Sequence, residues 1–182
     1  LDAFLQQALN GLTLGSIYGL VALGLTLVYG ILHVPNFAHG ALYMVGAYVS
    51  YFIMVEHGLN YWVAMLGAGL VVALLSVLCE RLVFHPLRHA PPIHDKIAAI
   101  GILLFLEALV QMHWGADFRR MPTPYTEIFN FGGLTLPAQR LLIIVGAFSL
   151  MGALHLYLKK TMTGSTIIAM AQNREGAFLV GI

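Results

Sequence analysis

The residues that could do chemistry in this sequence are few, and the first of them interrupt an apolar run. The stretch VPNFAHG places Asn36 and His39 between two long apolar segments. Pro35 disfavours helix at the residue before it and has no N–H to donate, and Asn is a favoured residue at helix starts. We therefore expect one helix to end near Val34 and the next to begin close to Asn36, with His39 in its first turn.

Three explanations of this polar step stay open. Asn36 can cap the second helix while His39 forms a hydrogen bond with a neighbouring helix. Alternatively, the two side chains line or gate a path, because polar residues at membrane depth face protein or a watery cavity. Tyr43 lies in the same segment and is a third candidate for lining or gating the path. A metal ion or a proton relay is the third explanation, although no second ligand lies at helical spacing from His39.

Glu107 is an acidic residue inside another apolar segment. A charged carboxylate in hydrocarbon is costly, so we expect Glu107 to be paired, protonated or hydrated. His113 and Gln111 are possible partners. A proton-coupled carrier would also need such a residue, which keeps that class of protein open.

Other features of the sequence argue against catalysis and metal binding. The histidines at 85, 89 and 94 are spaced H-x3-H-x4-H across prolines, which matches no recognised zinc site. The sequence contains no Walker-type phosphate loop and no HExxH motif. Cys79 is the only cysteine, so no internal disulfide can form, and a net charge of +1 argues against a nucleic-acid partner. We predict a chain that is not an enzyme and holds no metal or cofactor of its own.

The elements that must position these residues are membrane helices. The 182 residues are 59% hydrophobic and only 9% charged, whereas soluble domains are about 25% charged. The apolar residues form blocks of about 20, the length that crosses a bilayer, and backbone groups in hydrocarbon must pair within their own segment. We predict an all-α fold, a polytopic transmembrane helix bundle in one domain over residues 1–182. The five expected spans are at about 8–33, 37–55, 62–84, 97–114 and 141–158.

The distribution of Lys and Arg predicts how these helices are oriented. Arg88 and Lys96 follow the third span, and Lys159 and Lys160 follow the fifth, so both regions are expected on the cytoplasmic side. Segment 115–140 is then external, although it contains three arginines, and a Gly-Gly pair within it favours a small hairpin. The ending AFLVGI and the absence of an initial Met lead us to expect an incomplete, N-terminal portion of a longer protein.

Small residues are spaced for close helix packing. Gly11, Gly15 and Gly19 lie four apart in the first span and form one stripe. Small residues let helices approach in lipid, which itself provides no hydrophobic reason for association; a pore lining is the alternative role. The same packing role is expected for small residues of the second and third spans: Gly40, Gly46, Ala64, Gly67 and Ala68.

Two segments are similar to a known family. The stretch NGLTLGSIYGLVALGLTLVYGILHVPNFAHGALYMVGAY, residues 10–48, includes NFAHG, and ERLVFHPLR, residues 80–88, is the second, with His85 where Arg is commonest. The sequence resembles, over essentially its whole length, the permease subunits of bacterial ABC importers for branched-chain amino acids, the LivH-type family. The tail resembles the EAA-type coupling motif of such permeases. There the matching residues are Glu175, Gly176, Ala177 and Gly181, with Gly176 in place of the usual Ala.

The resemblance implies a multi-pass permease of the bacterial inner membrane that works by alternating access. It implies that segment 164–182 docks on cytoplasmic ATPase subunits, which bind the ATP and Mg. A second related permease subunit, an external substrate-binding protein and membrane lipid are the other implied partners. Three alternatives remain: a permease of the same family for urea or short amides, a proton-coupled secondary carrier or channel using Glu107 or His39, and a membrane enzyme or scaffold.

Overall fold

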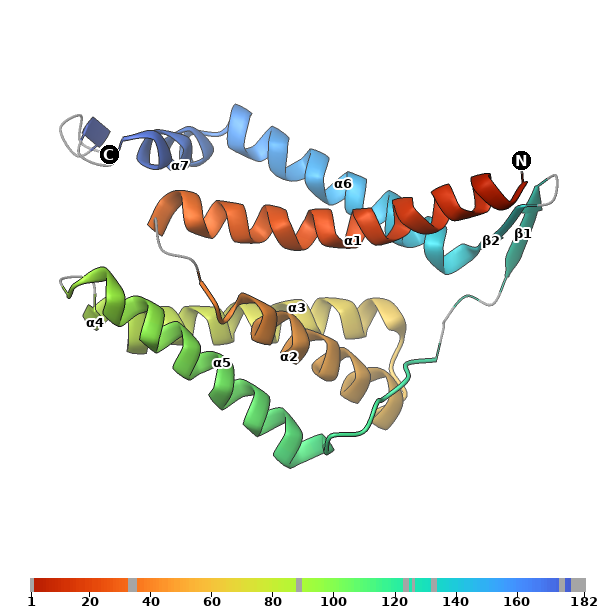
Figure 1. Ribbon diagram of the computed structural model, residues 1–182, viewed down its shortest axis with the longest axis horizontal. Coiled ribbons are helices and arrows are strands. Elements are labelled where there is room, and N and C mark those ends of the chain that lie inside the picture. Colours follow the sequence, from red (N-terminus) through yellow and green to blue (C-terminus); the bar gives the residue numbers. More distant parts are fainter. Residues whose placement is uncertain are drawn as a thin grey trace. The chain divides into compact units, whose positions relative to one another are not determined.

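The computed structural model describes residues 2–32, 36–87, 90–122, 125, 127–131, 134–173 and 176–177, and nearly all of its elements are helices (Figure 1). The residues group by contact into two compact units. Unit 1 comprises Leu1–His33 and Thr123–Ile182, and unit 2 comprises Val34–Pro122. The predicted all-α membrane fold is confirmed. The extent of one domain over residues 1–182 stays a prediction.

In the described part of the chain, four helical stretches are long and apolar enough to cross a membrane: Ala3–Gly30, Tyr61–Leu87, Ile93–Trp114 and Ala138–Lys160. The expected span at 37–55 corresponds to helix α2 (His39–Tyr51) and the π-helical turn η1 (Phe52–Glu56), which follow each other directly and fall outside these four. Its tyrosines and its polar ends make this stretch less apolar than the others.

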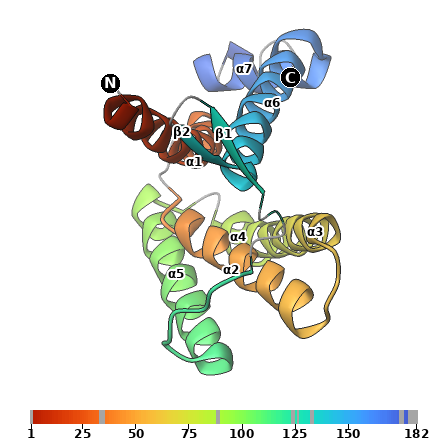
Figure 2. The same ribbon diagram turned by 90° about the vertical axis from the view of Figure 1, so that its right-hand side faces the viewer.

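Unit 1 contains α1 (Asp2–Leu32), strands β1 (Ile128–Phe131) and β2 (Leu134–Pro137), α6 (Ala138–Lys160) and α7 (Met162–Gln172). Helix α6 lies along α1, the strands lie beside the beginnings of both helices, and α7 follows the end of α6 (Figures 1 and 2). The two strands pair antiparallel, in the register of a β-hairpin. The expected hairpin is therefore present.

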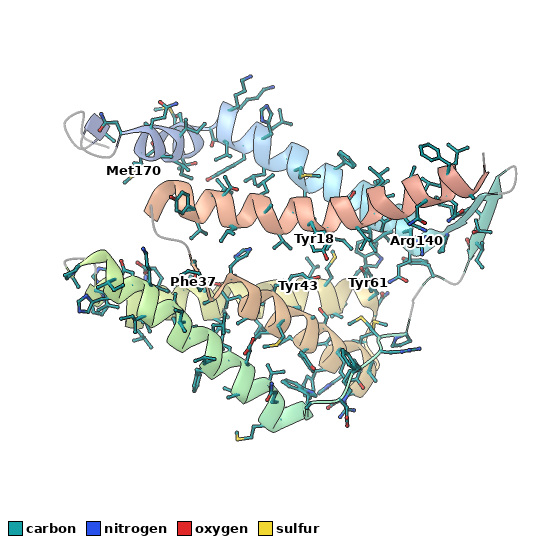
Figure 3. All side chains as sticks on the ribbon, in the orientation of Figure 1. Tyr18, Phe37, Tyr43, Tyr61, Arg140 and Met170 are labelled. Carbon is teal, nitrogen blue, oxygen red and sulfur yellow. The ribbon has the colours of Figure 1, made fainter. Side chains whose placement is uncertain are left out.

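Polar side chains fasten the hairpin to α1. The amide of Gln6 donates a hydrogen bond to the Thr135 carbonyl (3.0 Å) and accepts one from the Thr135 N–H (3.1 Å). The hydroxyl of Thr135 also bonds to Gln6 Oε1 (3.4 Å). Arg140, in the first turn of α6, donates to Asn10 Oδ1 (Figure 3). The beginning of α1 is thereby tied to both β2 and α6.

Unit 2 contains α2, η1, α3 (Tyr61–Cys79), the π-helical turn η2 (Glu80–Phe84), the short α4 (His85–Leu87) and α5 (Pro92–Trp114). Helix α2 packs against both α3 and α5, and its core joins Ala41 and Leu42 to Leu106 of α5. This places the segment that carries His39 and Tyr43 at the centre of its unit.

Small residues bring α2 and η1 close to α3. A Cβ added at Gly46 would lie 3.3 Å from Val72 Cγ2, and one at Gly67 would lie 2.8 Å from Ile53 Cδ1. Ala64 and Ala68 of α3 are buried. The packing role expected for these four small residues is confirmed, whereas an added Cβ at Gly40 meets no described atom within 4 Å.

The helices extend beyond most of the spans expected from hydropathy. Helix α1 begins at Asp2 rather than near residue 8, and α5 begins at Pro92 rather than near 97. Proline at the first helical position needs no N–H partner and favours a helix start, so α5 continues through the polar His-Asp-Lys sequence. Hydropathy marks the part of a helix that suits hydrocarbon, whereas local backbone preferences, such as proline at the first helical position, influence where the helix begins.

Replacing Gly46 with Leu tests the close approach of α2 to α3. The new side chain would overlap Val72, and overpacking of this kind lowers the free energy of unfolding by about 1–3 kcal/mol. The matched control is Gly40→Leu on the same helix, where an added side chain finds open space. Unfolding in mixed detergent micelles should separate the two variants, and an equal effect of both would contradict the close α2–α3 contact.

Candidate functional site

Asn36 forms a turn directly before helix α2. Its Oδ1 accepts a hydrogen bond from the Ala38 N–H (3.1 Å), and its carbonyl accepts one from the His39 N–H (3.1 Å). Helix α2 therefore starts at His39, with Ala38 at the N-cap position, slightly later than expected. The turn over Phe37 and Ala38 explains the delay. The residues at 34 and 35 lie outside the described part of the chain.

His39 and Tyr43 lie one turn apart on the same side of α2. His39 is half-buried, and the Tyr43 side chain is 59% exposed. Within the described residues, neither side chain forms a hydrogen bond, so the bond from His39 to a neighbouring helix that one explanation required is not seen there. Both side chains keep polar groups that could meet a ligand or a partner.

Tyr43 borders a groove of about 440 Å³ between α2 and α3. Figure 3 shows Tyr43 on α2 and Tyr61 at the start of α3. Tyr43, Ser50 and Tyr61 are the hydroxyl-bearing residues of its lining, and no charged side chain lines it among the described residues. Its remaining lining is mostly aliphatic: Leu42, Gly46, Ala47, Ala64, Met65, Ala68, Gly69, Val72 and Met121. Such a groove is large and apolar enough for a small aliphatic group.

Glu107 is half-buried in α5 and forms no hydrogen bond or ion pair within the described part of the chain. Neither suggested partner bonds to it. The His113 ring packs edge-on against Trp114, with ring centroids 4.5 Å apart. No group of three or more His, Cys, Asp or Glu side chains that could hold a metal occurs among the described residues. His85 and His94 are among those residues, and the third histidine, at 89, is not.

The glycine stripe of α1 approaches another described helix at its last position, Gly19. An added Cβ at Gly19 would lie 3.8 Å from Met151 Sδ of α6, whereas Gly11 and Gly15 have no described atom within 4 Å. Sequence reasoning missed Gly30, whose added Cβ would lie 3.7 Å from Ala171 Cβ of α7. The signal was present, because 11 residues are about three helical turns, which puts Gly30 on the side of Gly19.

The proposed coupling motif follows α7 and is only partly described. Glu175 and Gly181 lie outside the described residues. The Gly176 N–H donates to Asn173 Oδ1 (2.9 Å), and the N–H of Ala177, a buried residue, donates to the Asn173 carbonyl (3.0 Å). A Cβ at Gly176 would come within 3.2 Å of Asn173 Cγ. Gly176 therefore suits the turn in which the side chain and the carbonyl of Asn173 accept these two bonds.

The family described as "Branched-chain amino acid transport system / permease component" matches residues 7–182. The chain belongs to this family. The high-affinity branched-chain amino acid transport system permease protein BraD of Pseudomonas aeruginosa is 33% identical over 192 residues. The corresponding permease protein LivH is 34% identical over 193 residues in Escherichia coli and 33% identical in Salmonella typhimurium. No solved structure matches the chain.

This permease-family chain spans 62% of the length of these relatives, and each alignment covers 98% of the chain. The resemblance noted from the residues is confirmed. Family membership and the four apolar helices also confirm a multi-pass protein of the bacterial inner membrane.

Replacing Asn36 with Ala tests the turn at the start of α2. Loss of a capping side chain costs about 1 kcal/mol, so amide hydrogen exchange at Ala38 and His39 should accelerate about fivefold. Asn36→Asp should preserve the slow exchange. The matched control is Asn60→Ala, which removes the cap of α3, where Asn60 Oδ1 accepts from the Trp62 N–H (3.3 Å). That variant should affect α3 alone, and unchanged exchange at Ala38 in Asn36→Ala would refute the turn.

Proposed function

We propose that the intact protein is the membrane-spanning permease subunit of an ATP-driven ABC importer for branched-chain amino acids. The observation that carries the proposal is the family match over residues 7–182. Relatives at 33–34% identity are permease proteins of branched-chain amino acid transport systems. The chain supplies the wall of the path, and it is not an enzyme.

The groove between α2 and α3 supports the substrate class. Its aliphatic lining suits a branched hydrocarbon side chain, and the hydroxyls of Tyr43, Ser50 and Tyr61 suit the polar end of an amino acid. Urea and short amides bury little apolar surface and need many hydrogen bonds, which this lining offers less well. We therefore propose that α2, with Asn36, His39 and Tyr43, lines the translocation path.

The energy source is proposed to lie in partner subunits. The sequence contains no phosphate-binding loop, so ATP and Mg would bind to two cytoplasmic ATPase subunits on which segment 164–182 docks. A second related permease subunit would complete the path, and an external binding protein would deliver the substrate. In this proposal Lys159 and Lys160, which end α6, mark the cytoplasmic boundary.

Reconstitution with co-purified partner subunits tests the transport proposal. We expect ATP-dependent uptake of leucine, isoleucine and valine into vesicles and no uptake of urea. Glu107→Gln should leave this uptake largely unchanged. Uptake driven by a pH gradient without any ATPase, and lost in Glu107→Gln, would instead establish a proton-coupled carrier.

Removing residues 164–182 tests the docking segment. We expect loss of co-purification with the ATPase subunits, and the same loss when Glu175 and Gly181 are replaced together by Arg. A matched control is Glu127→Arg, an exposed acidic residue beside the hairpin, which should leave co-purification unchanged. If the ATPase still co-purifies with the truncated chain, the assignment of the docking segment is wrong.

A further inference from the structure

Helices α6 and α7 meet at a corner where the side chain of one threonine bonds to both helices. Thr161 Oγ1 donates a hydrogen bond to the Tyr157 carbonyl (2.7 Å) and accepts one from the Gly164 N–H (3.0 Å). The same Tyr157 carbonyl accepts the backbone N–H of Thr161 (3.1 Å). A single hydroxyl thus links a carbonyl in the last turn of α6 to an amide in the first turn of α7. The amide is one of those that a helix start otherwise leaves unpaired.

Gly164 allows the two helices to touch through their backbones. An added Cβ at Gly164 would lie 2.4 Å from the Tyr157 carbonyl oxygen, 2.5 Å from Leu158 Cα and 2.6 Å from the Leu158 carbonyl oxygen. Because these atoms belong to the backbone, they cannot turn aside as a flexible side chain can. Any residue larger than glycine would force α7 away from α6.

Two further contacts hold α7 in place. The hydroxyls of Tyr157 and Thr163 share a hydrogen bond of 2.8 Å across the corner. At the other end of α7, Ala171 packs against Gly30 of α1. Helix α7 is therefore held near both its ends by other parts of unit 1. The single residue that joins it to α6, Thr161, is itself fixed by its hydrogen bonds to both helices.

We propose that the corner formed by Tyr157, Thr161 and Gly164 makes α7 a rigid extension of α6, so that a displacement of α7 moves α6. Thr161 and Gly164 are then positioning residues for transport. This proposal rests on the proposed function, in which an ATPase binds the segment that begins with α7. With a flexible corner, the ATPase could tilt α7 while α6 stayed still, and hydrolysis would proceed without transport.

Thr161→Val tests the proposal in the reconstituted complex. Valine has nearly the same shape, but it can neither donate to Tyr157 nor accept from Gly164. Loss of a capping hydroxyl shifts the equilibrium at a helix start by about fivefold, so we expect the substrate carried per ATP hydrolysed to fall by about that factor. ATPase co-purification and hydrolysis should persist. Thr161→Ser keeps the hydroxyl and should restore the ratio.

Gly164→Ala should lower the same ratio because of its backbone overlap. Its matched control is Gly152→Ala in α6, where an added Cβ meets no described atom within 4 Å. A second measurement, independent of transport, uses spin labels on cysteines introduced at the exposed positions Leu150 and Ser165 after replacement of Cys79. The distance distribution should be narrow in the parent and in Thr161→Ser, and broad in Thr161→Val and Gly164→Ala.

The outcomes separate this proposal from the function on which it rests. Absence of ATPase association in the parent complex would overturn the proposed function and the coupling role with it. Normal association with an unchanged transport ratio in Thr161→Val would overturn the rigid corner alone. A broad distance distribution in the parent would do the same, and loss of association in Thr161→Val would show that the corner acts on docking instead of transmission.

Discussion

The structure depends on the need to pair every backbone N–H and C=O where water is absent. Helices meet this need along their length, so the unsatisfied groups collect at helix ends. Polar side chains are placed accordingly: Asn36, Asn60 and Thr161 each bond to a backbone amide where a helix begins. Within the helices, the hydroxyls of Thr13 and Ser16 bond back to carbonyls four residues earlier in their own helix. Among the described residues, these polar side chains therefore bond to the protein's own backbone.

The same environment determines how the helices associate. Lipid tails are as apolar as leucine, so large side chains gain little by leaving them, and many stay on the outside of their units. Contact instead comes from small residues that let helices approach. Gly46 and Gly67 allow this approach where α2 and η1 meet α3. Gly30 allows it where α1 meets α7. The α2–α3 groove lies beside one of these close contacts, because Gly46 and Val72, which approach each other, both line it.

Much of the fold could be predicted from the sequence because apolar length and small-residue spacing are local signals. The spans, the hairpin and the small packing residues of α2 and α3 all rest on such signals, whereas the contact between these two helices was not predicted. The start of α2 was predicted slightly early, because Asn36 caps a preceding turn, and its side chain pairs with the nearest free amide. The hydrogen bonds between Gln6 and Thr135 could not be predicted from the sequence. A glutamine near a helix start is common, and its partner lies far along the chain. The corner at Thr161 and Gly164 had a readable signal, a capping threonine followed by glycine. The roles of Glu175 and Gly181 stay predictions, because those residues lie outside the described part of the chain.

The long-range ties of unit 1 have a consequence for biogenesis. Gln6 and Thr135 are 129 positions apart, and Asn10 and Arg140 are 130 apart. Unit 2 occupies Val34–Pro122, the stretch synthesised between these partners, and this stretch forms a compact unit by itself. Local contacts form early and domains tend to fold as they emerge from the ribosome, so unit 2 can assemble while α1 still awaits α6. Helix α1 therefore acquires its contacts with β2 and α6 only after the whole of unit 2 has been synthesised.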